Sequence, residues 1–322
     1  MSIIDSDQLE KHKIRNVIHT LVFVLAMSAL TAMSASLLFG EGVWPWVLVG
    51  SALAFVMLPG VSPKWILNLY QAKPLNRFKA QQIYRMIDIL SQRAGLQVSP
   101  GLYWIPSNTL NAFAVGVKNN AAIAVSDGLL RTVNQKELAG ILAHEISHIA
   151  NNDLKLMNLA DILTRMTHLL SLLGIFFIIF TLPFILLGII SISWIGLLIL
   201  ITAPILSALL QFALSRVREF DADLEAVRLT GDPRGLASAL HKLERQHTGL
   251  WKKILFPGYK QSEPSLFRTH PDTQERIKRL LALAPNKTIN RTNQPWLNDA
   301  IAYSPLYPVH QPRHRFIIGL WH

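Results

Sequence analysis

Long runs of apolar residues without a charge alternate with polar segments along this chain. Two runs follow each other near the N-terminus, at residues 16–40 and 43–62, and a third extends over 50 residues from Met166 to Ser215. A helix needs roughly 20 predominantly apolar residues to cross a bilayer, so the longest run is sufficient for two crossings. We therefore expect four transmembrane helices in two hairpins. The second hairpin would have spans near 168–190 and 194–214, joined at 191–193.

Two of these assignments have alternatives. A cleavable signal peptide is the competing interpretation of the first run, but the run is long for one and another apolar run follows at once. We expect it to stay in the mature chain. For the third run, the alternative is a re-entrant hairpin, because Pro183 and Pro204 interrupt it.

The polar segments show shorter hydrophobic periods. Residues 80–93 repeat apolar positions at helical spacing, which predicts a helix. Three strand-like stretches follow, at 101–106, 112–117 and 121–125, and Asn119 with Asn120 suits a hairpin between the last two. At Asn134 the sequence NQKE is typical of a helix N-cap with a carboxylate three residues on. The motif HEISH at 144–148 therefore lies on a helix.

Composition supports a membrane protein. Of the 322 residues, 51% are hydrophobic and only 16% are charged. We expect a mainly α integral membrane protein with a small β-sheet, in which a hairpin interrupts a water-exposed domain. The predicted divisions are an N-terminal segment with the first hairpin (1–63), the first part of the domain (64–165), the second hairpin (166–215), the second part of the domain (216–284) and a tail of unknown role (285–322).

Charge and cysteine content narrow the chemistry. The net charge of +11 could indicate nucleic-acid binding, but clustered Lys and Arg beside apolar spans are more typical of the positive-inside rule. We expect the lipid bilayer as a partner and no nucleic acid. Four spans place every Lys and Arg on one side, which the rule assigns to the cytoplasm. The chain has no cysteine, which excludes disulfides, thiolate metal ligands and a cysteine nucleophile.

The HEISH motif carries the strongest chemical signal. On a helix, His144 and His148 lie one turn apart on one face and can direct ring nitrogens at a single metal ion. Glu145 lies beside them, where it can act as general base on a water molecule, as in metalloproteases with this motif. The alternative is a chance match on a solvated helix face. Apolar neighbours such as Ile141 and Ile146 oppose it, because desolvated ionisable groups without a metal or partners are costly.

A catalytic zinc needs a third protein ligand. No histidine follows at the HExxHxxGxxH spacing, so a carboxylate on a second helix is the best alternative. Glu219 follows the long apolar run, and Asp223 shares its helix face, so Glu219 can bind the metal while Asp223 accepts a hydrogen bond from a ligand histidine. From the pattern alone, an ordinary acidic turn balanced by Arg216 and Arg218 explains EFDAD equally well.

HEISH and the downstream EFDAD, separated by one apolar hairpin and preceded by another, resemble the HtpX-type membrane zinc metalloproteases, which are relatives of the CAAX prenyl endopeptidases. The resemblance covers roughly residues 15–284. It implies a zincin-like metalloprotease domain formed by 64–165 and 216–284. It also implies that Glu219 is the third zinc ligand and that Asp223 supports the metal site from behind.

Two further segments agree with this resemblance. NAFA at 111–114 is similar to the family strand beside the active site, which implies that Asn111, Ala112 and Phe113 bind substrate. HPDTQER at 270–276 is similar to the family HPxxxER segment, which implies that His270 takes part in catalysis near the scissile carbonyl and that Arg276 braces the acidic ligands. Without the resemblance, His270 would be read as a helix-start residue before a proline.

The resulting functional prediction is a membrane-embedded zinc metalloendopeptidase with one Zn²⁺ per chain. The resemblance implies substrates among membrane-associated or misfolded membrane proteins, in proteolytic quality control. It also implies a bacterial inner membrane, with the active site on the cytoplasmic side. The alternatives are a CAAX-type prenyl-protein endopeptidase, a non-enzymatic membrane adaptor with a structural metal site, and a transporter with a buried His/Glu ion site. Four spans favour the quality-control metalloendopeptidase over the CAAX-type endopeptidase, and the intact Glu145 opposes an inactive adaptor.

Overall fold

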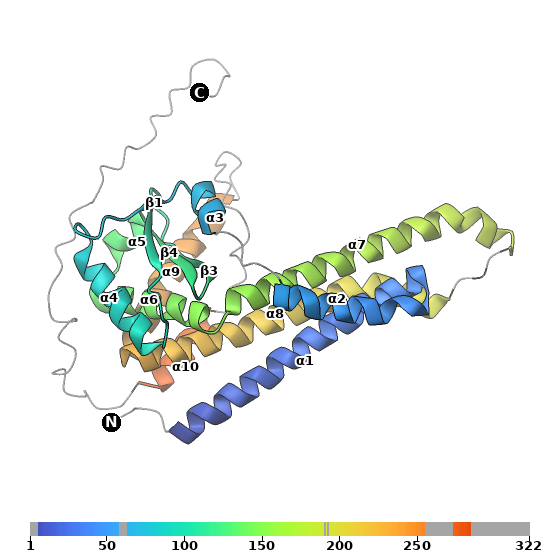
Figure 1. Ribbon diagram of the computed structural model, residues 1–322. Helices are drawn as coiled ribbons and strands as arrows, with labels where there is room; N and C mark the ends of the chain where they lie inside the picture. The colour runs from blue at the N-terminus through green and yellow to red at the C-terminus, as the bar shows by residue number, and fades with distance from the viewer. Residues whose placement is uncertain (1–5, 58–62, 190, 192, 255–272, 285–322) are drawn as a thin grey trace, which may run out of the picture.

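The computed structural model describes residues 6–57, 63–189, 191, 193–254 and 273–284. Long helices form a rod that projects from a smaller mixed domain (Figure 1). The helices of the rod are α1 (Ser6–Phe39), α2 (Trp44–Met57), α7 (Asp153–Leu186) and α8 (Trp194–Thr230). The short 3₁₀ helix η1 (Glu41–Val43) joins α1 to α2.

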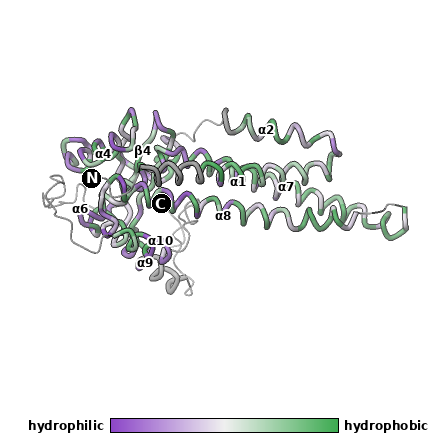
Figure 2. The backbone as a smooth tube through the Cα atoms, turned by 90° about the horizontal axis from the view of Figure 1, so that it is seen from below, coloured by the Kyte–Doolittle hydropathy of each residue, from purple (hydrophilic) through white to green (hydrophobic). Residues whose placement is uncertain are grey.

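Within the described residues, three helices are long and apolar enough to cross a membrane: α1 from Val17 to Phe39, α7 and α8. Hydrophobic residues dominate the projecting part of the rod (Figure 2). The predicted second span, 43–62, is not confirmed. Helix α2 has 14 residues, and such a helix is about 21 Å long, short of a hydrocarbon core of roughly 30 Å. Residues 58–62 lie outside the described part of the chain.

Helices α7 and α8 continue from the rod into the domain without a break. The predicted divisions at 165/166 and 215/216 both fall inside these helices. Helix α7 ends where Gly188 adopts φ 74°, a left-handed conformation that glycine accepts readily. Because α8 is continuous, residues near its domain end, such as Glu219, are held by the same helix that packs in the rod.

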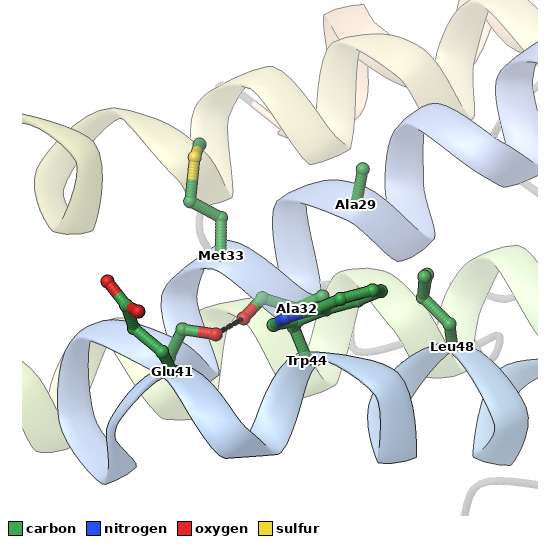
Figure 3. Close-up of a pocket in the computed structure, with 7 residues that line it drawn as sticks. Ala29, Ala32, Met33, Glu41, Trp44 and Leu48 are labelled. Carbon is green, nitrogen blue, oxygen red and sulfur yellow. Dashed lines mark hydrogen bonds between the residues drawn. The ribbon is translucent and has the colours of Figure 1, made fainter.

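Hydroxyl groups connect the helices of the rod. The Thr31 and Thr167 hydroxyls lie 2.8 Å apart between α1 and α7, and both residues are buried. Ser207 of α8 donates to the Thr164 hydroxyl at 3.2 Å. Such bonds and small side chains are typical of helices packed in a membrane. At the far end of the rod, a groove lies where α1 meets α2, lined mostly by apolar side chains, including Trp44, and by Glu41 (Figure 3).

The domain contains a small mixed sheet in the order β1-β2-β4-β3. Strands β2 and β4 are parallel, and the other neighbours are antiparallel. The three predicted strands are present, and the hairpin turn is at Lys118–Asn119, one residue earlier than predicted, because Asn120 already pairs with Val117. Strand β1 was not predicted. The strand bounds are β1 (Lys73–Pro74), β2 (Gly101–Ile105), β3 (Ala112–Val117) and β4 (Asn120–Ser126).

Helices cover both faces of this sheet. Side chains of one face, such as Ala114 and Ile123, pack in the main core with α4 (Gln81–Arg93), α6 (Gln135–Ala150) and α9 (Pro233–Ile254). Phe113 and Val115 of the other face pack against α3 (Pro63–Leu69). The short helices α5 (Asp127–Thr132) and α10 (Thr273–Ala282) complete the domain.

Helix α6 is the central element of the domain. The predicted N-cap is confirmed as a full capping box, in which the Asn134 side chain accepts from Glu137 N–H and the Glu137 carboxylate accepts from Asn134 N–H. Gly140 lets α9 approach closely, since an added Cβ would lie 3.0 Å from the Leu236 Cα. Helix α6 therefore presents the HEISH residues from a fixed position between the sheet and α8.

Candidate active site

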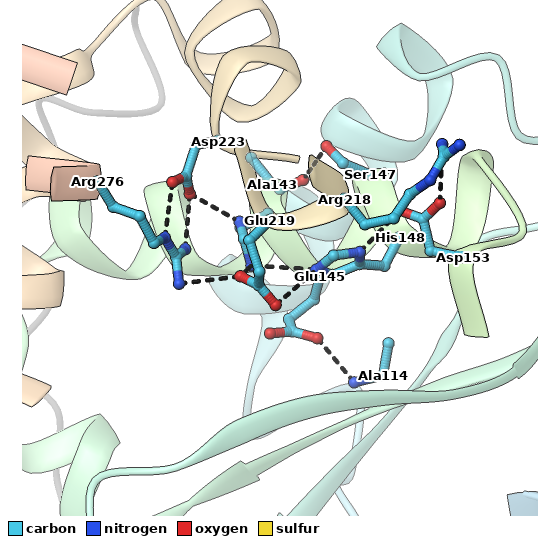
Figure 4. Close-up of polar contacts among 11 residues, drawn as sticks. Ala114, Ala143, Glu145, Ser147, His148, Asp153, Arg218, Glu219, Asp223 and Arg276 are labelled. Carbon is cyan, nitrogen blue, oxygen red and sulfur yellow. Dashed lines mark hydrogen bonds and ion pairs between the residues drawn. The ribbon is translucent and has the colours of Figure 1, made fainter. Parts of the chain in front are cut away.

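The two motif histidines and Glu219 converge from two helices. His144 and His148 lie on one face of α6, and the Glu219 carboxylate reaches them from α8 (Figure 4). The Nε2 atoms of the two histidines are 3.2 Å apart. Glu219 Oε2 lies 3.3 Å from His144 Nε2, and Glu219 Oε1 lies 3.9 Å from His148 Nε2.

These donors fit a zinc ion in type and spacing. Imidazole nitrogens and a carboxylate are common zinc ligands, and tetrahedral bonds of about 2.0–2.1 Å separate ligand atoms by roughly 3.3–3.4 Å. The distance between the two Nε2 atoms, 3.2 Å, and that from His144 Nε2 to Glu219 Oε2, 3.3 Å, are close to that spacing, and the other oxygen of Glu219 lies 3.9 Å from His148 Nε2. One ligand atom from each residue lies within 4.8 Å of the others. The site therefore offers the three protein ligands that a catalytic zinc would need.

Behind His144 lies a buried carboxylate held by an arginine. His144 Nδ1 is 3.0 Å from Asp223 Oδ1. The Arg276 guanidinium donates twice to Asp223, at 2.7 Å each, and its Nη1 lies 2.9 Å from Glu219 Oε2. Arg276 is only 3% exposed. It therefore contacts two buried carboxylates at once, and the bracing role expected for it stays a prediction.

His148 has a comparable arrangement from different elements. Its Nδ1 lies 2.9 Å from Asp153 Oδ2, at the start of α7. The other carboxylate oxygen, Asp153 Oδ1, lies 3.4 Å from Arg218 Nη1 of α8. The sequence did not predict that Asp153 and Arg218 lie behind His148. It indicated Arg218 only as a positive charge that balances the acidic residues of EFDAD. The available signal was weak, because Asp153 follows His148 by five residues, which is not a helical repeat.

The electrostatic surroundings favour positive charge at both histidines. Burial lowers the pKa of His144, but hydrogen bonds to Asp223 and Glu219 outweigh it and raise the pKa to about 10. Burial also lowers the pKa of His148, and the hydrogen bond to Asp153 reverses this, so that its pKa lies above the ordinary value. A bound divalent cation would be stabilised by the same negatively charged surroundings. Because zinc binds neutral imidazole, metal binding must displace these protons.

Glu145 connects the motif to the edge of the sheet. Its Oε2 accepts a hydrogen bond of 2.8 Å from the backbone N–H of Ala114 in β3 (Figure 4). On the other side of β3, Ser126 N–H donates to the Asn111 carbonyl. Since antiparallel strands alternate their hydrogen-bonding direction, the backbone groups of Ala112 and Ala114 point away from β4. Glu145 thus lies beside outward-facing backbone groups next to the metal ligands.

The expected substrate-binding residues are placed as follows. The backbone N–H of Asn111 donates to Ser126 Oγ at 3.0 Å. The Phe113 side chain is buried and packs on Tyr70, on the sheet face opposite α6. Substrate binding by Asn111, Ala112 and Phe113 stays a prediction, and for Phe113 it would involve the backbone. His270 lies outside the described residues, and its catalytic role also stays a prediction.

Comparison with known proteins identifies the relatives of this chain. The model of peptidase family M48 matches residues 77–284. A protease HtpX homolog of Methylibium petroleiphilum is 31% identical over 292 residues, covering 84% of this chain and 99% of that protein. One from Acaryochloris marina is 39% identical, covering 80% and 91%. Among solved structures, the crystal structure of S. mikatae Ste24p is similar to this chain. The match covers 84% of this chain and 66% of that chain, with 19% sequence identity and a TM-score of 0.39.

Proposed function

Since the chain belongs to peptidase family M48 and is a metalloprotease of the membrane, we propose that it is an endopeptidase with one zinc ion per chain. His144, His148 and Glu219 would hold that ion. The observation that carries the proposal is the convergence of these three donors at zinc-like spacing, beside a carboxylate, Glu145, that lies against an edge strand.

The chain's own residues account for the proton transfers of peptide hydrolysis. Bound zinc supplies Lewis acidity, which polarises the scissile carbonyl and makes water a stronger nucleophile near neutral pH. Glu145 is half-buried between the ligands and β3, where it can take the proton of the attacking water and give it to the leaving amine. His270, from the segment before α10, would stabilise charge near the reacting carbonyl, while Arg276 would hold the Glu219 and Asp223 carboxylates.

Strand β3 supports binding of an extended substrate. Among the described residues, β3 is an edge strand of the sheet, and a substrate strand that pairs there would take the Ala114 N–H from Glu145. A substrate that adds a strand there gains main-chain hydrogen bonds that do not depend on its side chains. This favours cleavage of unfolded or extended segments of varied sequence. Folded domains, whose backbone groups are already paired, would be poor substrates.

The position of Glu219 supports substrates at the membrane surface. This ligand lies in α8 four residues beyond Ser215, where the uncharged run ends. We place the site at the cytoplasmic face of a bacterial inner membrane, because Lys and Arg cluster at the domain end of the apolar helices. Misfolded or membrane-associated proteins would then be the substrates, which corresponds to proteolytic quality control.

Purified protein in detergent tests the proposal. With zinc, it should cleave an unfolded casein-like substrate at internal bonds, and Glu145→Gln should lower the rate by at least about 100-fold while zinc content stays unchanged. Glu41→Gln, at the far end of the rod, is the matched control and should cleave normally. Undiminished cleavage by Glu145→Gln would exclude this mechanism. Absence of cleavage by the wild type with zinc bound would favour the adaptor.

A further inference from the structure

Asp153 lies behind His148 only because the chain breaks between two helices. Helix α6 ends at Ala150 and α7 begins at Asp153. Asn152, between them, adopts the left-handed conformation, with φ 57° and ψ 29°. On one continuous helix, residues five apart point about 140° away from each other, so a straight helix would direct Asp153 away from the ring. The left-handed residue instead returns the first turn of α7 to His148.

The carboxylate of Asp153 is well defined in this position. Asp153 is 2% exposed, and its two oxygens face His148 Nδ1 at 2.9 Å and Arg218 Nη1 at 3.4 Å. It is also the first residue of a helix of 34 residues, where the helix dipole favours a negative charge. In the tautomer that carries its hydrogen on Nδ1, the imidazole donates to Asp153 Oδ2. The opposite nitrogen, Nε2, is then the one that faces His144 and Glu219.

Arg218 connects this contact to the third ligand. It precedes Glu219 in α8, so one helix supplies both a zinc-binding carboxylate and the guanidinium that holds Asp153. Its side chain is 12% exposed. The resulting chain of contacts joins α6, α7 and α8. A relative displacement of α7 and α8, which are packed together in the rod, would therefore move the ring of a metal ligand.

On the proposed zinc site, we infer that Asp153 is the positioning residue for His148 and that Arg218 holds Asp153 in place. The arrangement parallels that of His144, in which Asp223 Oδ1 lies 3.0 Å from the ring Nδ1 and Arg276 holds Asp223. The two ligand histidines thus have separate carboxylate–arginine supports. The support of His148 comes from α7 and α8. The zinc affinity of the site therefore depends on how these two helices of the transmembrane hairpin pack together.

Zinc affinity measured by competition with a chelator tests this inference without relying on proteolysis. Asp153→Ala should weaken zinc binding by about 10- to 100-fold, the usual cost of removing a partner behind a metal ligand. Asp153→Asn keeps an acceptor oxygen and should fall between this variant and the wild type. The absorption spectrum of the Co²⁺-substituted protein should change in Asp153→Ala, because the orientation of a ligand ring changes.

The matched control is Asp161→Ala, which removes an exposed carboxylate of the same helix that pairs with Arg165. It should leave zinc affinity and the cobalt spectrum unchanged. If Asp153→Ala does not fold, Asp153→Asn and Arg218→Gln decide, since both should weaken zinc binding. Wild-type zinc affinity and cobalt spectra in the folded variants would overturn the inference alone. A wild-type chain without a zinc site would overturn the proposed function and this inference together.

Discussion

The Glu137 carboxylate offers a direct test of how the HEISH helix is held. It accepts hydrogen bonds from Asn134 N–H at 2.8 Å, Ser238 Oγ at 2.6 Å and Lys242 Nζ at 2.6 Å. Its side chain is 3% exposed, whereas that of Lys242 is 35% exposed. Replacing the carboxylate by an amide in Glu137→Gln leaves an NH₂ group facing donors. The ion pair with α9 is then lost and the capping box is impaired.

The magnitude follows from these contacts. Removing one partner of a buried ion pair costs about 3–5 kcal/mol, and the partial exposure of Lys242 favours the low end, about 3 kcal/mol. For a chain of 322 residues, that corresponds to a fall in Tm of about 4–5 °C. The measurement is thermal unfolding in detergent followed by circular dichroism, with a chelator present so that zinc binding does not contribute.

The pH dependence of the Tm tests independently that the ionised Glu137 carboxylate stabilises the fold. Burial raises the pKa of Glu137, but the hydrogen bonds from Lys242, Ser238 and Asn134 lower it by more than burial raises it. The pKa of Glu137 therefore lies below its ordinary value of 4.5. The stabilisation is therefore present above the unfolded-state pKa and is lost as the pH falls through the folded-state pKa. The Tm difference between wild type and Glu137→Gln should be full at pH 7 and should narrow below about pH 4.5.

Asp88→Asn is the control for this experiment, because Asp88 forms an exposed ion pair with Arg77. Such pairs contribute about 0–1 kcal/mol, so its Tm should fall by no more than about 1.5 °C. The reasoning would be refuted by a Tm of Glu137→Gln within about 2 °C of wild type at pH 7, or by a difference that does not narrow in acid.

Three further predictions concern the metal and the rod. Glu219→Ala should abolish tight zinc binding, measured by metal analysis after dialysis, whereas Asp221→Ala should retain it; full retention in the first would assign another carboxylate as ligand. Zinc affinity should rise by on the order of tenfold per pH unit from pH 6 to 8 for each proton displaced, because the pKa of His144 in the metal-free site is about 10; a flat profile would contradict this. Thr31→Val should lower the Tm of the detergent-solubilised protein by weakening the contact with Thr167, with a cost of about 0.6–1.7 kcal/mol, and an unchanged Tm would assign that hydroxyl pair no role in packing.

Several features were readable from local patterns. Capping at Asn134, the three strands and the apolar character of α1, α7 and α8 follow from residue types within one element. The pairing of HEISH with Glu219 could not be predicted from a local pattern, because the long apolar run separates the two segments. The resemblance supplied that link, and the structure brings the residues together.

Other features depended on the path of the chain in three dimensions. The second predicted span has suitable composition, but the helix formed there within the described residues is short. Phe113 belongs to a motif expected to bind substrate, yet strand alternation directs its side chain into the core behind the sheet.

By itself, the sequence determined the helix that carries HEISH, the apolar character of α1, α7 and α8 and the chemical type of the candidate metal site, because these depend on periodicity and on residue type. Only the tertiary structure decided what lies behind the ligands. Asp153 reaches His148 through a left-handed residue at Asn152, and Arg218 reaches Asp153 across 65 positions of the chain. Neither contact repeats with a helical or strand period, so the spacing of residues along the chain could not reveal it.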